Sequence, residues 1–227
     1  PRLPGTVAHW RPVKRDGMLV EQDISGNGND MALVTAGIAA NAVTLVADHM
    51  TYSSATHAVR FTPKATHMFS YFATDKNAPV NKERFEKGYT FETFIKIDND
   101  YSSANYWGAF VCRGGRRGDL PNFKVPGADA DDLKEPPMAG AISSLKEMQW
   151  AFTDVGKAGH GYSVWSGDVD LDKWYHVAVV DDPEQGSVVM YINGVPMLRN
   201  EYGTPGVAHG INGFDDRAWI IGGSMYN

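Results

Sequence analysis

The chain has 227 residues, of which 43% are hydrophobic and 11% aromatic, and its formal net charge is −6 at pH 7. This composition supplies a substantial core and is typical of neither a disordered nor a fibrous protein. The acidic balance argues against a nucleic-acid-binding protein, which normally carries a basic surface. No apolar stretch approaches the roughly 20 residues that a membrane-spanning helix needs.

Short runs of β-branched and aromatic residues recur along the whole chain, separated by Gly, Asn, Asp and Pro. This pattern predicts strands joined by tight turns. Helical periodicity is almost absent, and only residues 81–87 are compatible with a turn or two of helix. In chain order, the predicted strands are Thr6–Trp10, Asp30–Val34, Ala58–Thr62, Met68–Phe72, Tyr89–Ile97, Trp107–Cys112, Ala139–Ser144, Glu147–Thr153, Tyr162–Trp165, Trp174–Val180, Ser187–Ile192 and Ala218–Ile221.

The segment from Trp174 to Leu198 is the most informative part of the sequence. It reads as three strands joined by an acidic turn at residues 181–186 and by Asn193-Gly194, a pair that suits a two-residue hairpin turn. Both faces of the first strand are largely apolar, so we expect a central strand covered on two sides, with His176 as a core histidine. Together with the other strands, this meander predicts an all-β fold, a two-sheet antiparallel jelly-roll sandwich.

Polar residues dominate the stretch 114–137, which we expect to be a long loop. The basic cluster Arg113–Arg117 at its start is interpreted as a solvated, Gly-rich hairpin tip and not as a binding site for phosphate or nucleic acid. The single cysteine, Cys112, lies in an apolar run, which predicts a buried and inert thiol.

Four segments in this order resemble the laminin-G-like, concanavalin A-like lectin domains of the bacterial, pentraxin-related type. They are Asp23–Asp30, Tyr89–Lys96, the meander with its Asn193-Gly194 turn, and Ile220–Gly223. The pattern is also similar to the module appended to secreted calcineurin-like phosphoesterases. The resemblance implies a jelly-roll sandwich, often with bound calcium, that recognises glycans or proteins outside the cytoplasm. The chain starts at Pro1 and lacks the further strand that such domains carry after the late Gly-Gly. We therefore expect residues 1–227 to be one laminin-G-like domain, a fragment of a larger secreted protein.

Oxygen-bearing side chains gather in the loop from Asp23 to Asp30. Calcium takes six to eight oxygen ligands, and this loop offers carboxylates, amides, a hydroxyl and carbonyls freed by glycine. An Asx-rich turn explains the same residues, so both interpretations stay open. The resemblance favours Ca²⁺, the only cofactor we expect, with Asp23, Asn27, Asn29 and Asp30 as its ligands.

Aromatic side chains in the middle of the chain are candidates for stacking on sugar rings. We predict Tyr101, Tyr106, Trp107 and Trp165 as ligand-binding residues, although most tryptophans of a sandwich belong to its core. The two tyrosines flank or lie in a polar run and are expected to be exposed.

Signatures of catalysis are missing from the sequence. The Glu-x-Asp-x-x-Glu pattern of laminarinase-type enzymes, the Gly-Asn-His element of binuclear phosphoesterases and the Gly-x-Ser-x-Gly elbow do not occur. We predict a non-catalytic, extracytoplasmic module that binds carbohydrate or a cell-envelope ligand and is accessory to a phosphoesterase-like enzyme elsewhere in the full protein. The alternatives are a glycoside hydrolase or polysaccharide lyase on the same fold, and a structural domain that packs on a catalytic neighbour.

Overall fold

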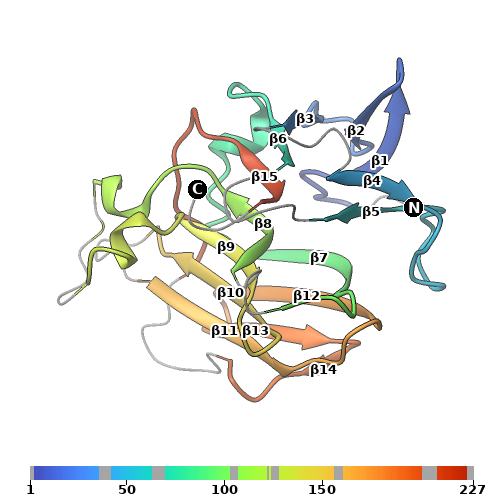
Figure 1. The fold of residues 1–227 in the computed structure, drawn as a ribbon. Helices are drawn as coiled ribbons and strands as arrows, with labels where there is room; N and C mark the ends of the chain where they lie inside the picture. Colours follow the sequence, from blue (N-terminus) through green and yellow to red (C-terminus); the bar gives the residue numbers. More distant parts are fainter. Residues whose placement is uncertain are drawn as a thin grey trace.

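The protein is a β-sandwich with one additional hairpin (Figure 1). The computed structural model describes residues 3–35, 42–62, 70–102, 107–121, 123, 128–155, 161–200 and 209–223. The strands are β1 Trp10–Arg15, β2 Met18–Asp23, β3 Met31–Thr35, β4 Val43–Val46, β5 Ala58–Phe61, β6 Ser70–Thr74, β7 Tyr89–Lys96, β8 Gly108–Arg113, β9 Met138–Ile142, β10 Glu147–Thr153, β11 Gly161–Asp168, β12 Trp174–Asp182, β13 Ser187–Ile192, β14 Val195–Pro196 and β15 Trp219–Gly222. The described residues also form the 3-10 turns η1 Pro79–Lys82, η3 Arg117–Asp119 and η4 Asp132–Lys134.

Two antiparallel sheets form the sandwich. The larger has nine strands in the order β1-β2-β3-β6-β15-β8-β9-β10-β11, and the smaller has four in the order β14-β13-β12-β7. The β4–β5 hairpin packs against the larger sheet, because the Phe61 ring meets that of Phe72 edge-on at 6.2 Å between centroids. The predicted all-β, two-sheet antiparallel sandwich is confirmed.

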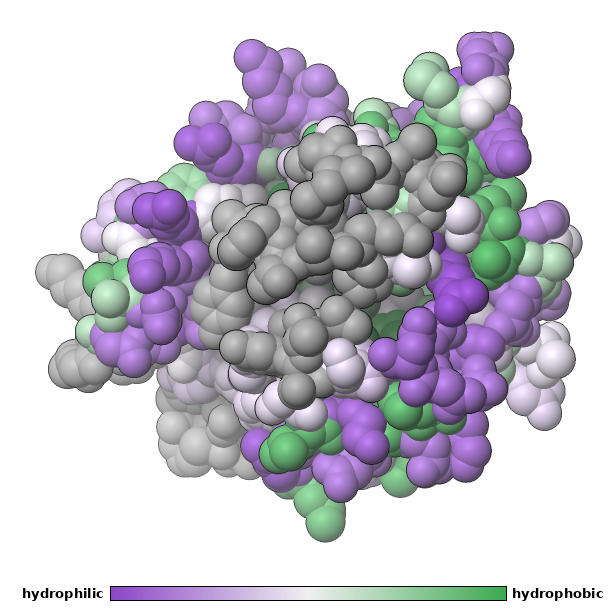
Figure 2. All heavy atoms as spheres, viewed as in Figure 1, coloured by the Kyte–Doolittle hydropathy of each residue, from purple (hydrophilic) through white to green (hydrophobic). Residues whose placement is uncertain are grey.

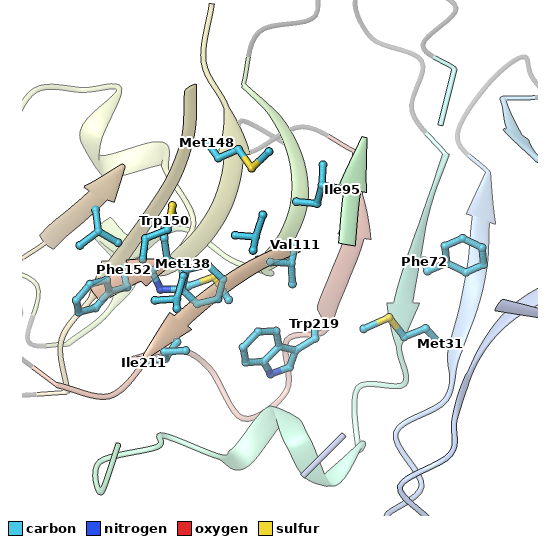
Figure 3. Close-up of a cluster of buried hydrophobic side chains, with 14 of the residues drawn as sticks. Met31, Phe72, Ile95, Val111, Met138, Met148, Trp150, Phe152, Ile211 and Trp219 are labelled. Carbon is cyan, nitrogen blue, oxygen red and sulfur yellow. The ribbon is translucent and has the colours of Figure 1, made fainter. Parts of the chain in front are cut away.

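The core lies between the two sheets, where the inward-facing residues of their strands meet (Figure 3). Strand β10 contributes Trp150 and Phe152, and strand β12 contributes Val177 and Val179. The ring of Phe91, from β7 of the smaller sheet, lies 4.7 Å from that of Trp150. Aromatic rings therefore join the two sheets across the middle of the sandwich.

The predicted meander is confirmed as β12, β13 and β14. Asn193 and Gly194 have φ values of 51° and 79°, as a primed two-residue turn requires. The prediction that His176 is a core histidine is wrong. Its side chain is 30% exposed on the outer face of the smaller sheet, 3.6 Å from the carboxylate of Glu92. β12 is central within its sheet and has apolar residues on its outer face as well as its inner one. This is the sequence pattern of a strand that is covered on both faces, although the outer face of β12 is partly exposed.

Beginning the first strand at Thr6 was wrong, because the hairpin β1–β2 follows that segment. Its turn is Asp16-Gly17, whose φ values are 52° and 81°. An Asp-Gly pair between two short runs of strand-forming residues predicts a hairpin, and this signal was missed in the sequence. The β4 strand was also missed, since Val43–Val46 has only four residues.

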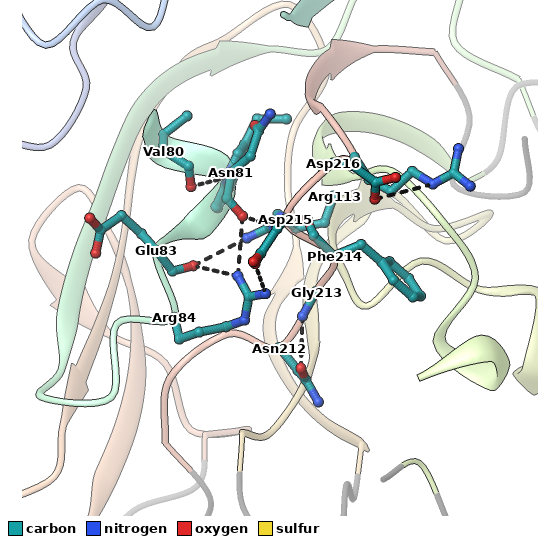
Figure 4. A network of polar contacts seen from close by, with 12 residues as sticks. Val80, Asn81, Glu83, Arg84, Arg113, Asn212, Gly213, Phe214, Asp215 and Asp216 are labelled. Carbon is teal, nitrogen blue, oxygen red and sulfur yellow. Dashed lines mark hydrogen bonds and ion pairs between the residues drawn. The ribbon is translucent and has the colours of Figure 1, made fainter. Parts of the chain in front are cut away.

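The basic cluster at the end of β8 is solvated at Arg116, as predicted, but not at Arg113. Arg113 is fully buried, and its guanidinium donates hydrogen bonds to the carbonyl oxygens of Asn81 at 2.7 Å and Phe214 at 3.0 Å (Figure 4). It also lies over the Trp219 ring, 5.2 Å from the centroid. Alternation along β8 turns Arg113 inward, and backbone carbonyls replace its water shell.

A lobe that contains η3 and η4 follows β8, and Arg117, a second arginine of the cluster, stabilises it. Arg117 pairs with Asp132 at 2.7 Å and with Glu135 at 2.9 Å, which ties η3 to η4. The lobe lies at the left of Figure 1, and mostly hydrophilic residues cover it in Figure 2. The predicted loop therefore has an internal polar framework.

Candidate functional site

The Asp23 carboxylate organises the predicted calcium loop. Its Oδ1 accepts the backbone N–H groups of His9 and Ser25, both at 2.9 Å, and its Oδ2 accepts that of Asn29 at 3.0 Å. Burial opposes ionisation of this carboxyl, but these hydrogen bonds, with one from the Ser25 side chain, outweigh it and lower the pKa of Asp23.

The other three predicted ligands also make hydrogen bonds within the protein. Asp30 accepts the N–H of Asp23 at 2.8 Å and pairs with Arg15 at 3.0 Å. Asn29 accepts the N–H of Val80 at 2.9 Å, and the side-chain amides of Asn27 and Asn29 both donate to the carbonyl oxygen of Val7.

Protein N–H groups thus point at the oxygens that would ligate calcium. Because Ca²⁺ needs six or more oxygens around one point, binding here requires several of these hydrogen bonds to be released. Within the described part of the chain, no three His, Cys, Asp or Glu side chains are grouped as a metal site. Calcium binding by Asp23, Asn27, Asn29 and Asp30 stays a prediction.

The two tryptophans predicted to bind ligand lie in contact. The rings of Trp107 and Trp165 meet edge-on, with 6.4 Å between their centroids. Trp107 precedes β8 at a φ of 60°, where its backbone N–H donates to the carbonyl oxygen of Ile142 at 2.7 Å. Positive φ is unfavourable for a bulky residue, so this backbone position stores strain.

Tyr101 reaches the same part of β9 but not as an exposed residue. Its hydroxyl donates to the carbonyl oxygen of Ser143 at 2.6 Å, and its ring packs against the core. Burial raises the pKa of Tyr101 to about 12. Tyr101 is therefore partly buried against the core and not the exposed residue that was predicted, and Tyr106 lies outside the described residues.

An arginine that the sequence analysis missed covers Trp165. The Arg199 guanidinium lies 4.6 Å from the centroid of the Trp165 ring, and its Nη1 is 2.5 Å from Oε1 of Glu147. The Arg199 side chain is 55% exposed, whereas that of Glu147 is 11% exposed. An open cation therefore rests between an aromatic face and a largely buried carboxylate.

The backbone around Arg199 is fixed by both sheets. The Arg199 carbonyl oxygen accepts the N–H of Trp165 at 3.1 Å, which ties it to the edge strand β11. Next to it, the Asn200 side chain accepts the N–H of Met190, from β13, at 2.6 Å. This seam between the sheets explains why no short-range sequence signal marks Arg199.

Small and polar residues form the outer face of the larger sheet beside these groups. Gln149 is the register partner of Trp165, and its amide donates to the hydroxyl of Ser163 at 3.0 Å. Beyond them lies a buried cluster of small residues, against which Trp107 packs: Ala109, Cys112, Ala139 and Ala141. The six residues that we call the Trp165 site are Trp107, Glu147, Gln149, Ser163, Trp165 and Arg199.

Cys112 is buried, as predicted. Its side chain is buried in the small-residue cluster, and this burial raises the pKa of the thiol to about 12. A thiol that stays protonated at neutral pH is a poor nucleophile. Cys112 is therefore part of the scaffold beneath the Trp165 site.

A second group of partly exposed rings lies on the outer face of the smaller sheet. The rings of Phe94 and His176 lie 5.1 Å apart between centroids, tilted by 42° to one another. Nearby, the Trp174 indole donates to the Asp48 carboxylate at 2.9 Å. This face provides matched aromatic controls for experiments on the Trp165 site.

Comparison with protein families settles the relationship that this fold suggests. The family model described as the concanavalin A-like lectin/glucanases superfamily matches residues 70–227, more than half of the chain. The chain belongs to this superfamily. The superfamily match contains the whole Trp165 site, whereas the Asp23–Asp30 loop precedes it. The predicted family is confirmed at this level, and the phosphoesterase-associated type stays a prediction.

Solved structures resemble the chain only distantly. A carbohydrate esterase, vb_24B_21 from Shiga toxin-encoding bacteriophage phi24B, has 15% identity and a TM-score of 0.41, with 83% of this chain and 80% of that chain covered. The alginate lyase AlyC3 has 13% identity and a TM-score of 0.37, with 71% and 66% covered. The carbohydrate-binding module CBM66 from Bacillus subtilis has 12% identity and a TM-score of 0.32, with 68% and 74% covered. The chain thus spans slightly less than two thirds of AlyC3. No curated protein matches the chain.

The described residues contain no helix with the length and apolar character that crossing a membrane requires.

Proposed function

We propose that the protein is a non-catalytic carbohydrate-binding module whose ligand binds at the Trp165 site. The observation that carries the proposal is the contact between two tryptophans beside a fixed Arg199–Glu147 pair on the outer face of a sheet. Membership in a superfamily of lectins and glucanases supports it.

The side chains of the site supply the two kinds of contact that sugars need. An indole ring can pack against the C–H face of a pyranose, and Trp107 is the candidate for this contact, because the Arg199 guanidinium lies over the Trp165 ring. Charged and amide groups can bond the sugar hydroxyls. Arg199 offers N–H donors at its open edge, and Gln149 and Ser163 offer polar groups on the same face. The strained backbone of Trp107 is consistent with a position kept for binding.

The setting of the module is part of the same proposal. We place it outside the cytoplasm, with a glycan or other cell-envelope ligand, as an accessory to an enzyme carried elsewhere in the full protein. Calcium dependence would arise at the Asp23–Asp30 loop. If calcium binds there, the midpoint of thermal unfolding is higher with calcium than with chelator, and an equal midpoint argues against the metal.

A glycan array and affinity gel electrophoresis test the binding site. Trp107→Ala and Trp165→Ala should each weaken binding about tenfold or more, because the first removes an aromatic contact and the second removes the ring on which Arg199 rests. Phe94→Ala removes a comparable ring from the opposite sheet and should bind like the wild type. Wild-type protein that binds no glycan, or loss of binding in Phe94→Ala alone, would overturn the proposal.

A glycoside hydrolase is the second candidate, favoured by one pair of carboxylates. Glu147 and Asp168 are register partners across β10 and β11, next to the tryptophans. Paired carboxylates can act as acid and nucleophile in glycoside cleavage. Release of reducing ends from polysaccharides by the wild type, with loss in Asp168→Asn, would favour this function, and no release would exclude it for the polymers tested.

A further inference from the structure

We infer that the Trp165 site selects neutral polysaccharides over acidic ones, because Glu147 already neutralises the arginine that an acidic sugar would need. The inference rests on the proposed function, since it names the class of ligand for the same site. It follows from the position of three side chains: Trp165, Arg199 and Glu147.

The Arg199 cation is compensated from within the protein. Its Nη1 donates to Oε1 of Glu147 at 2.5 Å, and the flat guanidinium rests on the Trp165 ring. Glu147 is only 9% exposed as a residue, so its charge depends on Arg199 more than on water. A ligand carboxylate would have to compete with Glu147 for the same cation.

The remaining groups of the site add no positive charge. Gln149 and Ser163 are neutral and bonded to each other. The residue opposite Glu147 in the register is Asp168, so the neighbouring strand adds a negative and not a positive charge beside the pair. The whole chain carries a net charge of −6, which repels polyanions at long range.

Neutral sugars carry groups that match those of the site. Their hydroxyls can accept from the exposed N–H groups of Arg199 without displacing Glu147, and their apolar ring faces suit the Trp107 indole. Binding governed by such contacts depends little on salt, whereas binding of a polyanion weakens steeply as salt screens the charges.

Affinity gel electrophoresis in neutral and acidic polymers separates the outcomes. We expect retardation by at least one neutral polymer, such as a β-glucan or galactomannan, with affinity changing less than about twofold between 50 and 500 mM salt. We expect no retardation by polygalacturonate or alginate. Tighter, salt-sensitive binding to the acidic polymers would overturn the inference while leaving the proposed function intact. Binding to neither class would overturn the proposed function itself.

Glu147→Gln tests the compensation directly. It frees the Arg199 charge, so the variant should gain salt-sensitive binding to polygalacturonate, by about fivefold or more. Glu92→Gln makes the same change of charge on the opposite sheet and should gain none. A gain in both variants, or in neither with Glu147→Gln folded, contradicts the inference.

The double variant Arg199→Gln/Glu147→Gln gives a second test, because it replaces the cation together with the carboxylate that would otherwise stay buried without its partner. The Arg199 side chain is largely exposed and Glu147→Gln keeps the shape of the buried group, so this variant should fold. It should weaken binding to neutral polymers about fivefold and create no binding to acidic ones. Unchanged binding to neutral polymers would remove Arg199 from the site.

Discussion

Asp23 shows how one side chain can hold a loop together whether or not a metal is present. Its carboxylate accepts three backbone N–H groups from three different residues. Asp23→Ala should therefore lower the free energy of unfolding by about 3 kcal/mol, because buried donors lose a charged acceptor. Urea denaturation monitored by tryptophan fluorescence measures this loss. Asp170→Asn alters an exposed carboxylate that pairs with the exposed Lys173 and should leave stability unchanged.

The low pKa of Asp23 gives this contribution a defined pH dependence. Since the folded pKa lies below the ordinary value of 3.8, the stabilisation is complete above that value and is lost as pH falls through the folded pKa. The difference between wild type and Asp23→Ala should be constant from pH 5 to 8 and shrink below about pH 4. A difference that persists in strong acid would argue against ionisation as its origin.

Glu21 has the opposite behaviour. It lies on β2 between register partners Pro12 and Met31, and burial raises the pKa of its carboxyl from 4.5 to about 8. Because the folded pKa is the higher one, the contribution of Glu21 to stability is most favourable below about pH 4.5 and is lost as pH rises through about 8. Glu21→Gln removes this loss, so its stability relative to wild type should grow by on the order of 4 kcal/mol between pH 5 and 9. Parallel pH profiles for the two proteins would contradict this account of Glu21.

The sequence predicted some residues of the candidate site but not their partners. Aromatic composition and the family resemblance pointed to Trp107 and Trp165. Nothing local identified Arg199, whose contact with Glu147 spans 52 positions in the chain. Long-range contacts of this kind depend on how the two sheets close, which periodicity does not encode.

At the level of elements, prediction succeeded where a strand was long and its alternation regular. The strands β7, β10, β12 and β13 were placed within a residue or two. It failed at β4, which is short, and at β1, whose residues Trp10–Arg15 mix charge, aromatic and proline. Their strand conformation comes from pairing with neighbours, a tertiary effect that outweighs local propensity.

Packing between elements depends on Gly140 in β9. A Cβ atom on this residue would lie 2.2 Å from the Phe110 ring, far inside van der Waals contact. Gly140→Ala should therefore destabilise the protein by about 1–3 kcal/mol, because the ring has to leave its position. Thermal unfolding measures the effect, and adding Phe110→Leu should recover part of it. If the double variant is as unstable as the sum of the single ones, the clash is not the cause.

For the whole molecule, Arg113 joins segments that are distant in the chain. Its guanidinium bonds the η1 segment at Asn81 and the segment before β15 at Phe214 (Figure 4). Arg113→Met leaves these buried carbonyls without donors and should cost about 3–5 kcal/mol of unfolding free energy. Arg116→Met, at an exposed neighbour, should cost almost nothing. Equal losses of unfolding free energy for the two variants in guanidinium chloride denaturation would show that the Arg113 hydrogen bonds do not stabilise the fold.

The larger sheet ends at β1, and the composition of this strand bears on how the protein behaves at high concentration. An open edge invites pairing with another chain and the growth of fibrils. Pro12 has no N–H to offer at this edge, and three cations in six residues, Arg11, Lys14 and Arg15, disfavour stacking of identical strands. The feature that made β1 hard to recognise therefore also protects the protein against aggregation.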